Sequence, residues 1–153
     1  MSTHCVVRKA EPGDYAGWRP LWDGYNAFYG REGESALPER ITQLSWQRFL
    51  DPEEPMHALV ADDQGSLVGL AHYLFHRSTI RPELSCYLSD LYTLPAQRGR
   101  GVGRALIEGV YAACRSADVR GVSWQTHETN AAGRRLYDTL ARYDGFIVYD
   151  REI

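Results

Sequence analysis

The sequence has no apolar run of the roughly 18–20 residues that a membrane-spanning helix needs. The N-terminal stretch MSTHCVVRKAEPGD lacks the apolar core of a secretory signal peptide. Only three cysteines occur, Cys5, Cys86 and Cys114, and neither they nor the five scattered histidines have the spacing of zinc ligands. We therefore expect no membrane partner and no metal, and the odd number of cysteines favours a reducing, cytoplasmic compartment.

A dense basic surface is also missing. The net charge is −3, with an acidic excess in residues 1–90 and a small basic excess in residues 91–153. Domains that bind nucleic acid concentrate lysine and arginine on one face, so we expect no nucleic-acid partner. The length of 153 residues and the 44% hydrophobic content indicate a single domain, residues 1–153, with a hydrophobic core.

The pattern of apolar residues predicts a mixed α/β domain in the order β-α-α-β-β-β-α-β-α-β. We expect strands at 5–10, 56–62, 67–77, 85–94, 121–126 and 145–153, and helices at 14–28, 38–50, 102–115 and 130–142. Asp14 is expected to cap the first helix, and Pro20 to kink or divide it. The tetrapeptide DQGS predicts a hairpin, and residues 85–126 predict a right-handed crossover between parallel strands.

The segment QRGRGVGRAL, residues 97–106, places three glycines in five positions between a predicted strand and a predicted helix. The first N–H groups of a helix have no partner within the helix, and glycine lets an anion approach them closely. The segment ends in neither the Gly-Lys-Ser/Thr of a P-loop nor the spacing of a dinucleotide-binding G-x-G-x-x-G. From these residues alone, a phosphate site and an ordinary strand-to-helix turn are equally good interpretations.

RGRGVG, residues 98–103, resembles the Q/R-x-x-G-x-G/A signature of the GNAT superfamily of N-acetyltransferases. Four other segments resemble parts of this family in the same order: VVRKAEPGD, YLSDLYTLPAQRGRGVGRALIE, NAAGRRLYDTL and GFIVYDRE. The resemblance implies the GNAT acyl-CoA N-acyltransferase fold, in which two adjacent central parallel strands splay apart. It also implies acetyl-CoA as co-substrate and a homodimer.

The resemblance assigns residues to the coenzyme. It places the pyrophosphate on the glycine turn, and the pantetheine arm on the open edge of the preceding strand and on Asn130. A backbone N–H near Leu91 or Tyr92 would stabilise the oxyanion of the tetrahedral intermediate. The implied coenzyme residues are Leu91, Tyr92, Thr93, Arg98, Gly99, Arg100, Gly101, Val102, Gly103, Arg104 and Asn130.

Two residues are candidates for proton transfer. By resemblance, Tyr137 is the general acid for the coenzyme thiolate; from the residues alone, a core tyrosine is the favoured interpretation. Asp90 is a candidate general base or amine anchor, with a cap or strand anchor as the alternative. His127 and Glu128, which follow a predicted strand, are further candidates near the acceptor, although a surface role suits each of them individually.

Five aromatic residues in the first predicted helix, spaced 3, 4, 3 and 4 apart, share one helical stripe. Such a stripe is usually part of the core. Trp22, Tyr25 and Tyr29 could instead wall a pocket for an amine through cation–π contacts.

The sequence therefore predicts an enzyme that moves the acetyl group of acetyl-CoA to a primary amine, which is a small amine, a polyamine or a lysine-like acceptor. Two alternatives remain at this point. One is a non-catalytic regulatory module that binds acyl-CoA. The other is an acyltransferase that uses a different acyl-CoA or acceptor.

Overall fold

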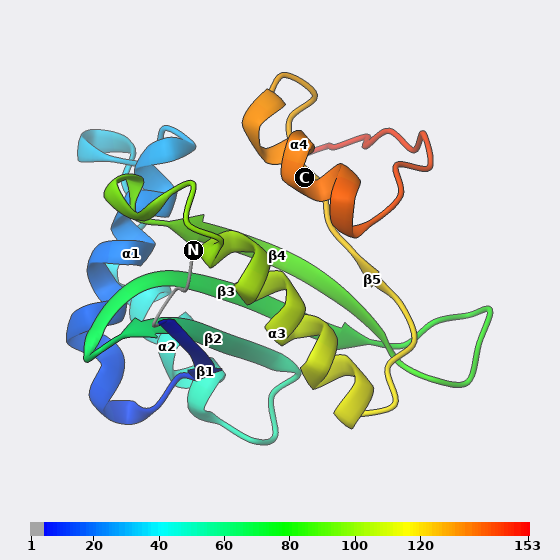
Figure 1. Ribbon diagram of the computed structural model, residues 1–153, viewed down its shortest axis with the longest axis horizontal. Helices are drawn as coiled ribbons and strands as arrows, with labels where there is room; N and C mark the ends of the chain where they lie inside the picture. The colour runs from blue at the N-terminus through cyan, green and yellow to red at the C-terminus, as the bar shows by residue number, and fades with distance from the viewer. Residues whose placement is uncertain (1–4) are drawn as a thin grey trace.

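The protein is described by a computed structural model that covers residues 5–153. A five-stranded sheet lies at its centre, with helices packed on it (Figure 1). The strands are β1 (Cys5–Lys9), β2 (Met56–Asp63), β3 (Ser66–His76), β4 (Ser85–Thr93) and β5 (Val122–Ser123). The helices are α1 (Tyr15–Phe28), α2 (Glu39–Leu50), α3 (Val102–Ser116) and α4 (Ala131–Leu140), with single 3₁₀ turns η1 (Pro12–Asp14), η2 (Gly33–Ser35) and η3 (Pro95–Gln97).

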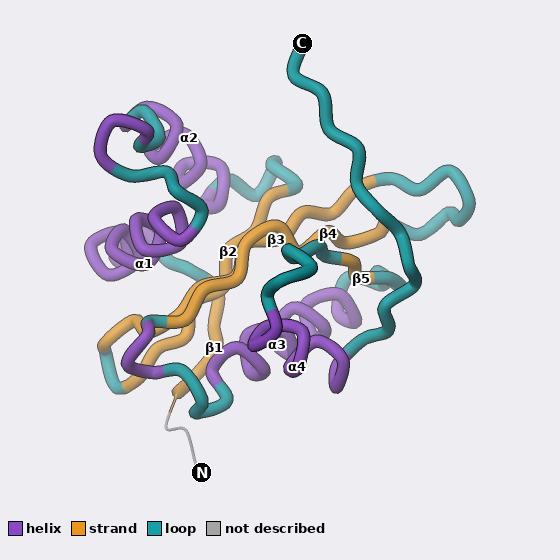
Figure 2. The backbone as a smooth tube through the Cα atoms, turned by 90° about the horizontal axis from the view of Figure 1, so that it is seen from above, coloured by secondary structure: helices purple, strands orange, loops and turns teal. Residues whose placement is uncertain are grey.

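The sheet has the strand order β1-β2-β3-β4-β5, and only the β4–β5 pair is parallel. Helices α1 and α2 lie on one face, and α3 and α4 on the other (Figure 2). The predicted order of elements is confirmed as far as α4. A two-residue turn joins β2 to β3, which form the expected hairpin, with positive φ at both Gln64 and Gly65.

Each face of the sheet has its own core. The side chains that α3 buries against the sheet follow its predicted 3.6-residue period: Val102, Leu106, Ile107, Val110 and Cys114. The opposite core is built mainly from aromatic residues of α1 and α2, among them Trp18, Trp22, Tyr25, Trp46 and Phe49. No helix within residues 5–153 is both long enough and apolar enough to cross a lipid bilayer.

The parallel strands separate early. β4 pairs with β5 only through Cys86 with Val122 and Tyr87 with Ser123. The strand predicted at 121–126 is therefore two residues long, because the chain turns away from β4 after Ser123. This separation confirms the predicted splay and leaves the second half of β4 without a neighbour on that side.

The structure does not bear out the predicted cap at Asp14 or the predicted division of the first helix at Pro20. Asp14 precedes α1 but makes no side-chain capping bond to it. Its carboxylate instead accepts hydrogen bonds from Arg8, at 2.8 and 2.9 Å, and from the backbone N–H of Glu11. A bidentate guanidinium is the stronger partner for a carboxylate. Pro20 does not divide the helix, which runs unbroken from Tyr15 to Phe28.

The predicted final strand at 145–153 is also wrong. Residues 141–153 form neither helix nor strand, and they extend away from the sheet (Figure 2). Phe146, Ile147, Val148 and Tyr149 are each at least 67% exposed. The composition favours a strand, but a strand also needs a neighbouring edge, and no backbone hydrogen bond joins residues 142–153 to the rest of the described chain. We call residues 142–153 the C-terminal arm.

Candidate functional site

The glycine turn has a defined backbone. Gly99 and Gly101 both have left-handed φ angles, 75° and 83°, and Gly101 is the residue immediately before α3. A Cβ added at either position would meet no atom within 4 Å. The backbone conformation, and not crowding by the protein, is thus what favours glycine here, and the space above the turn is open.

The same turn presents unused hydrogen-bond donors. The helical ladder of α3 begins with the bond from Ala105 N to Gly101 O, at 3.0 Å. None of the backbone N–H groups of residues 99–104 donates a hydrogen bond within the described part of the chain. A row of free donors at the positive end of a helix suits a pyrophosphate, so the geometry favours the phosphate interpretation over an ordinary turn.

The three arginines of the turn differ in their contacts. Arg98 donates from Nε to the carbonyl of Thr93 at 3.1 Å, and its guanidinium lies 5.6 Å from the centre of the Tyr92 ring. Arg104 donates to Thr139 Oγ1 at 2.7 Å and so joins α3 to α4. Arg100 is exposed, with one long contact of 3.4 Å to a glutamine side chain. Arg98 and Arg104 therefore hold the turn in place, and Arg100 is the least committed charge.

The end of β4 leads directly into this turn. Leu91, Tyr92 and Thr93 pair with β3 on one side, opposite Ala71, Leu70 and Gly69. On the other side their edge is open, because β5 has already separated. An open strand edge thus lies next to the free amides of the glycine turn, and binding of a pantetheine arm there stays a prediction.

A cavity of about 480 Å³ lies between the end of α1 and the segment that follows β5. Its walls include Tyr29, His127 and Asn130. Glu128 does not line it; that side chain is exposed, and its carbonyl accepts a bond from Arg134. Of the two predicted residues in this segment, the fold brings only His127 to the cavity.

Asn130 has a clear role in the fold. Its Oδ1 accepts the N–H of Gly133 at 3.2 Å as the cap of α4, and its Nδ2 donates to Thr126 Oγ1 at 2.9 Å. A Cβ on Gly133 would lie 2.5 Å from Asn130 Nδ2, so this glycine makes room for the cap. Both ends of the amide are thus engaged, and binding of the coenzyme by Asn130 stays a prediction.

Tyr137 lies on α4 and packs its ring edge-on against Trp124, with 5.5 Å between ring centres. Burial raises the pKa of its hydroxyl, and the neighbouring Tyr29 raises it further. That hydroxyl donates no hydrogen bond within residues 5–153. Tyr137 is therefore a protonated phenol with its donor available.

Asp90 is held by a buried histidine that the sequence did not indicate. His72 is 1% exposed, and its Nδ1 lies 2.8 Å from Asp90 Oδ2. On the other side of the ring, Trp18 Nε1 lies 3.0 Å from His72 Nε2. Indole nitrogen can only donate, so Nε2 accepts and Nδ1 carries the proton that is donated to Asp90. Trp18 thereby sets the tautomer of a neutral His72, which orients the carboxylate.

His72 could not be singled out from the sequence because it stands in the apolar run LVGLAHYLFHR. Only the antiparallel register places it opposite Asp90, beside an irregularity of the ladder between His72 and Tyr73. Such bulges change the direction of side chains in a strand. That run holds two histidines, His72 and His76, and the sequence does not show which of them is buried beside a carboxylate.

The aromatic stripe of α1 passes from the core to the site. Trp22 is buried, donates to Thr42 Oγ1 at 3.2 Å and stacks on Tyr25. Tyr25 reaches the carbonyl of Ser89 with its hydroxyl at 3.3 Å, while Tyr29 is 47% exposed and lines the cavity. Trp22 and Tyr25 are thus core residues, contrary to the predicted pocket wall, and of the three only Tyr29 lines the cavity.

Comparison with known proteins agrees with this geometry. Residues 18–141 match the model of the acetyltransferase (GNAT) family. The chain belongs to the GNAT family. It is accordingly an acetyl-CoA-dependent N-acetyltransferase, with the mixed α/β fold that the sequence predicted.

Relatives and solved structures extend the comparison. The D-amino-acid N-acetyltransferase HPA3 of Saccharomyces cerevisiae is 32% identical over 153 residues, which cover 99% of this chain and 92% of the yeast protein. The structure of AAC(6')-Iy with the bisubstrate analogue CoA-S-monomethyl-acetylneamine aligns with a TM-score of 0.82 at 17% identity, over 98% of this chain and 99% of that one. A ribosomal-protein-alanine N-acetyltransferase of Brucella melitensis biovar Abortus 2308 aligns with a TM-score of 0.76 at 17% identity, over 97% and 99%. At such identities, the two structures show the shared fold alone.

Metal ligands were not expected. Among the residues that the structure describes, no three His, Cys, Asp or Glu side chains are grouped so that they could hold a metal ion.

Replacement of Gly101 by alanine tests the glycine turn. A left-handed alanine costs about 1–2 kcal/mol of backbone strain, and its Cβ would project into the open space above the amides. We expect Gly101→Ala to raise the Kd for CoA at least about tenfold by isothermal titration calorimetry. Gly65→Ala is the matched control, because Gly65 has φ 94° and equally open surroundings in the hairpin. Equal CoA affinity in the two variants would support an ordinary turn.

Proposed function

We propose that the protein acetylates a primary amine at the open edge of β4, and that the amine is a small amine, a polyamine or a lysine-like group. This proposal depends on one observation: the backbone N–H groups of the glycine turn are free, and they lie next to an unpaired strand edge. The name of the yeast relative adds amino acids to the acceptors that deserve testing.

Acetyl-CoA would supply the acetyl group as a thioester. The amides of residues 99–104 would bind its pyrophosphate, with Arg100 adding charge, and the edge at Leu91–Thr93 would bind its pantetheine arm. A backbone N–H near Leu91 or Tyr92 would stabilise the negative charge that develops on the carbonyl oxygen.

Asp90 would bind the acceptor and take its proton. An amine with a pKa near 10.4 is neutral in only about one molecule per few thousand at pH 7, so a positioned carboxylate is useful. His72 fixes Asp90 through a hydrogen bond to Oδ2, and the aspartate side chain retains 19% exposure. Its carboxylate is thus rigid and still accessible to an ammonium group.

Tyr137 would protonate the departing thiolate. The nitrogen lone pair of the acceptor attacks the carbonyl carbon, the C–S bond breaks, and the sulfur receives the phenolic proton. The proton that the acetylated nitrogen releases restores the phenol through solvent. Because the pKa of Tyr137 lies above its ordinary value near 10, the phenol stays protonated at neutral and mildly alkaline pH.

Tyr137→Phe removes this proton donor without removing the ring that packs on Trp124. We expect kcat to fall about 10²-fold, at the lower end of general-acid effects, with unchanged CoA affinity. In the wild-type enzyme, loss of kcat at high pH should occur above pH 10, because the pKa of the acid is raised. Thiol release from acetyl-CoA measures both. Unchanged turnover in the phenylalanine variant would exclude Tyr137 as the acid.

A second test addresses Asp90 and its support. Asp90→Asn should lower kcat about 10²-fold, because an amide cannot accept the proton. His72→Gln keeps an acceptor for Trp18 and a donor for Asp90, so it should retain much more activity than His72→Leu, which leaves both partners unsatisfied. The measurement is kcat with saturating acetyl-CoA. Equal losses in the two His72 variants, at equal thermal stability, would contradict the proposed positioning.

We also propose that the protein is a homodimer in which the C-terminal arms are exchanged. The arm carries consecutive apolar, strand-forming residues that are exposed, and β5 is an edge strand of the sheet. Ala141 is extended, with φ −152° and ψ 179°, so the chain leaves α4 without turning back. A second copy can offer each arm a sheet edge and cover its apolar side chains, each worth about 1.5–3 kcal/mol when fully buried.

We propose that the protein acts in a reducing, cytoplasmic compartment. Cys5, Cys86 and Cys114 are free thiols, and the last two are buried. Burial raises the pKa of Cys86 and of Cys114, which keeps both thiols protonated and unreactive.

Deletion of residues 145–153 should convert the dimer into a monomer, measured by analytical ultracentrifugation at micromolar concentration. Ile80→Asp is a control, because Ile80 is an exposed apolar residue outside the arm and its substitution should leave the dimer intact. A wild-type chain that sediments as a monomer would exclude the exchange.

A further inference from the structure

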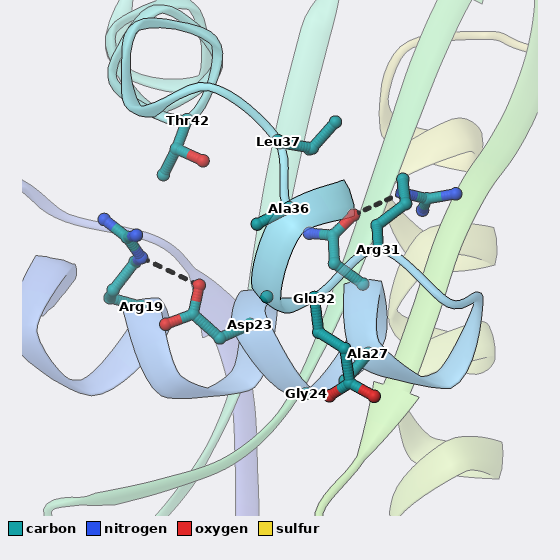
Figure 3. A pocket seen from close by; sticks show the side chains of 11 residues that line it. Arg19, Asp23, Gly24, Ala27, Arg31, Glu32, Ala36, Leu37 and Thr42 are labelled. Atoms are coloured by element: carbon teal, nitrogen blue, oxygen red, sulfur yellow. Dashed lines mark hydrogen bonds and ion pairs between the residues drawn. The ribbon is translucent and has the colours of Figure 1, made fainter.

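Arg31 follows α1, and its side chain lines the pocket shown in Figure 3 and lies over the rings of Tyr25 and Tyr29. Its guanidinium carbon lies 5.8 Å from the centre of the Tyr25 ring and 5.4 Å from that of Tyr29. Its Nε donates to Asn26 Oδ1 at 2.7 Å, a bond drawn as a dashed line in Figure 3. Asn26 is itself 4% exposed and donates from Nδ2 to the carbonyl of Trp22 at 2.9 Å. A buried amide and two aromatic faces thus hold the side chain of Arg31.

The charge of Arg31 is not neutralised by the protein. No ion pair and no hydrogen bond engages its two terminal nitrogens within residues 5–153. Arg19, on α1, differs in this respect: it forms ion pairs with Asp23 at 2.9 Å and with Glu39 at 2.7 Å. An ordered guanidinium with free N–H groups is well suited to bind a carboxylate in a bidentate way.

The side chains of Arg31 and Asp90 both act on Tyr25. Burial raises the pKa of the Tyr25 hydroxyl, the nearby carboxylate of Asp90 raises it further, and the guanidinium of Arg31 opposes this shift. The hydroxyl also contacts the carbonyl of Ser89, the residue before Asp90, at 3.3 Å. A negative group therefore lies at the hydroxyl end of Tyr25 and a positive group over its ring.

We propose that Arg31 binds the carboxylate of the acceptor, and that the acceptor is an amino acid whose amine lies at Asp90. This inference rests on the proposed function of Asp90 as amine anchor. An amino acid carries the opposite charges that such a pair of groups recognises. A polyamine offers only cations, which Arg31 would repel. Arg31 is therefore the residue that distinguishes amino acids from other amines.

Matched acceptors test this assignment. Phenylalanine, as separate D and L forms, carries the carboxylate, whereas phenylalanine methyl ester and phenethylamine lack the negative charge. Thiol release from acetyl-CoA gives KM and kcat for each. In the wild-type enzyme, at least one enantiomer of phenylalanine should have a KM about tenfold or more below that of phenethylamine. Arg31→Gln should raise that KM to the level of phenethylamine and leave the KM of phenethylamine and of the ester unchanged.

Arg19→Gln is the control, because it removes an equal charge from the same pocket and should not change the discrimination. The proposal is overturned if Arg31→Gln weakens all acceptors equally, since Arg31 would then only support the fold. It is also overturned if the wild-type enzyme acetylates phenethylamine as well as either form of phenylalanine, and in that case acetylation of amines itself still holds. Absence of acetylation with every amine tested would instead overturn both this inference and the proposed function.

Discussion

The separation of β4 from β5 after two residue pairs is the constraint on which the site depends. In a continuous sheet, the backbone groups at Leu91–Thr93 would be bonded to a neighbouring strand. Here they lie at an open edge that continues into the free amides of residues 99–104. The first N–H groups of a helix have no partner within it and carry partial positive charge, so this row of unpaired donors suits an anionic ligand.

A chain of buried polar contacts ties this edge to the core. Hydrogen bonds of 3.0 and 2.8 Å join His72 on β3 to Trp18 on α1 and to Asp90 on β4. Aromatic rings enclose the histidine, and the centre of the Phe49 ring lies 4.3 Å from the centre of the imidazole. A satisfied buried network is rigid because each member would be costly to leave unpaired. The same helix carries Tyr25, and the turn that follows its end carries Tyr29 and Arg31. Helix α1 and this turn thereby place the guanidinium over the ring of Tyr25, whose hydroxyl contacts β4.

Periodicity predicted the helices and the first four strands, because each of them buries one face or stripe against the sheet. It was wrong at 145–153 for a physical reason: strand composition is necessary for a strand, but the neighbouring edge has to exist as well. The preference of aspartate for helix starts was also misleading at Asp14, because its carboxylate has a better partner in Arg8, a residue of the preceding strand. Boundaries and side-chain partners of this kind depend on which segments meet.

The sequence by itself determined the class of fold and the glycine turn, since alternating glycines between a strand and a helix permit few backbone conformations. The left-handed angles at Gly99 and Gly101 agree with that limit. Only the tertiary structure decided that His72 faces Asp90, that Asn130 is engaged at both ends, and that Arg31 retains a free guanidinium. These features join residues from separate elements, and their distances are set by strand register and helix packing, which local pattern does not specify.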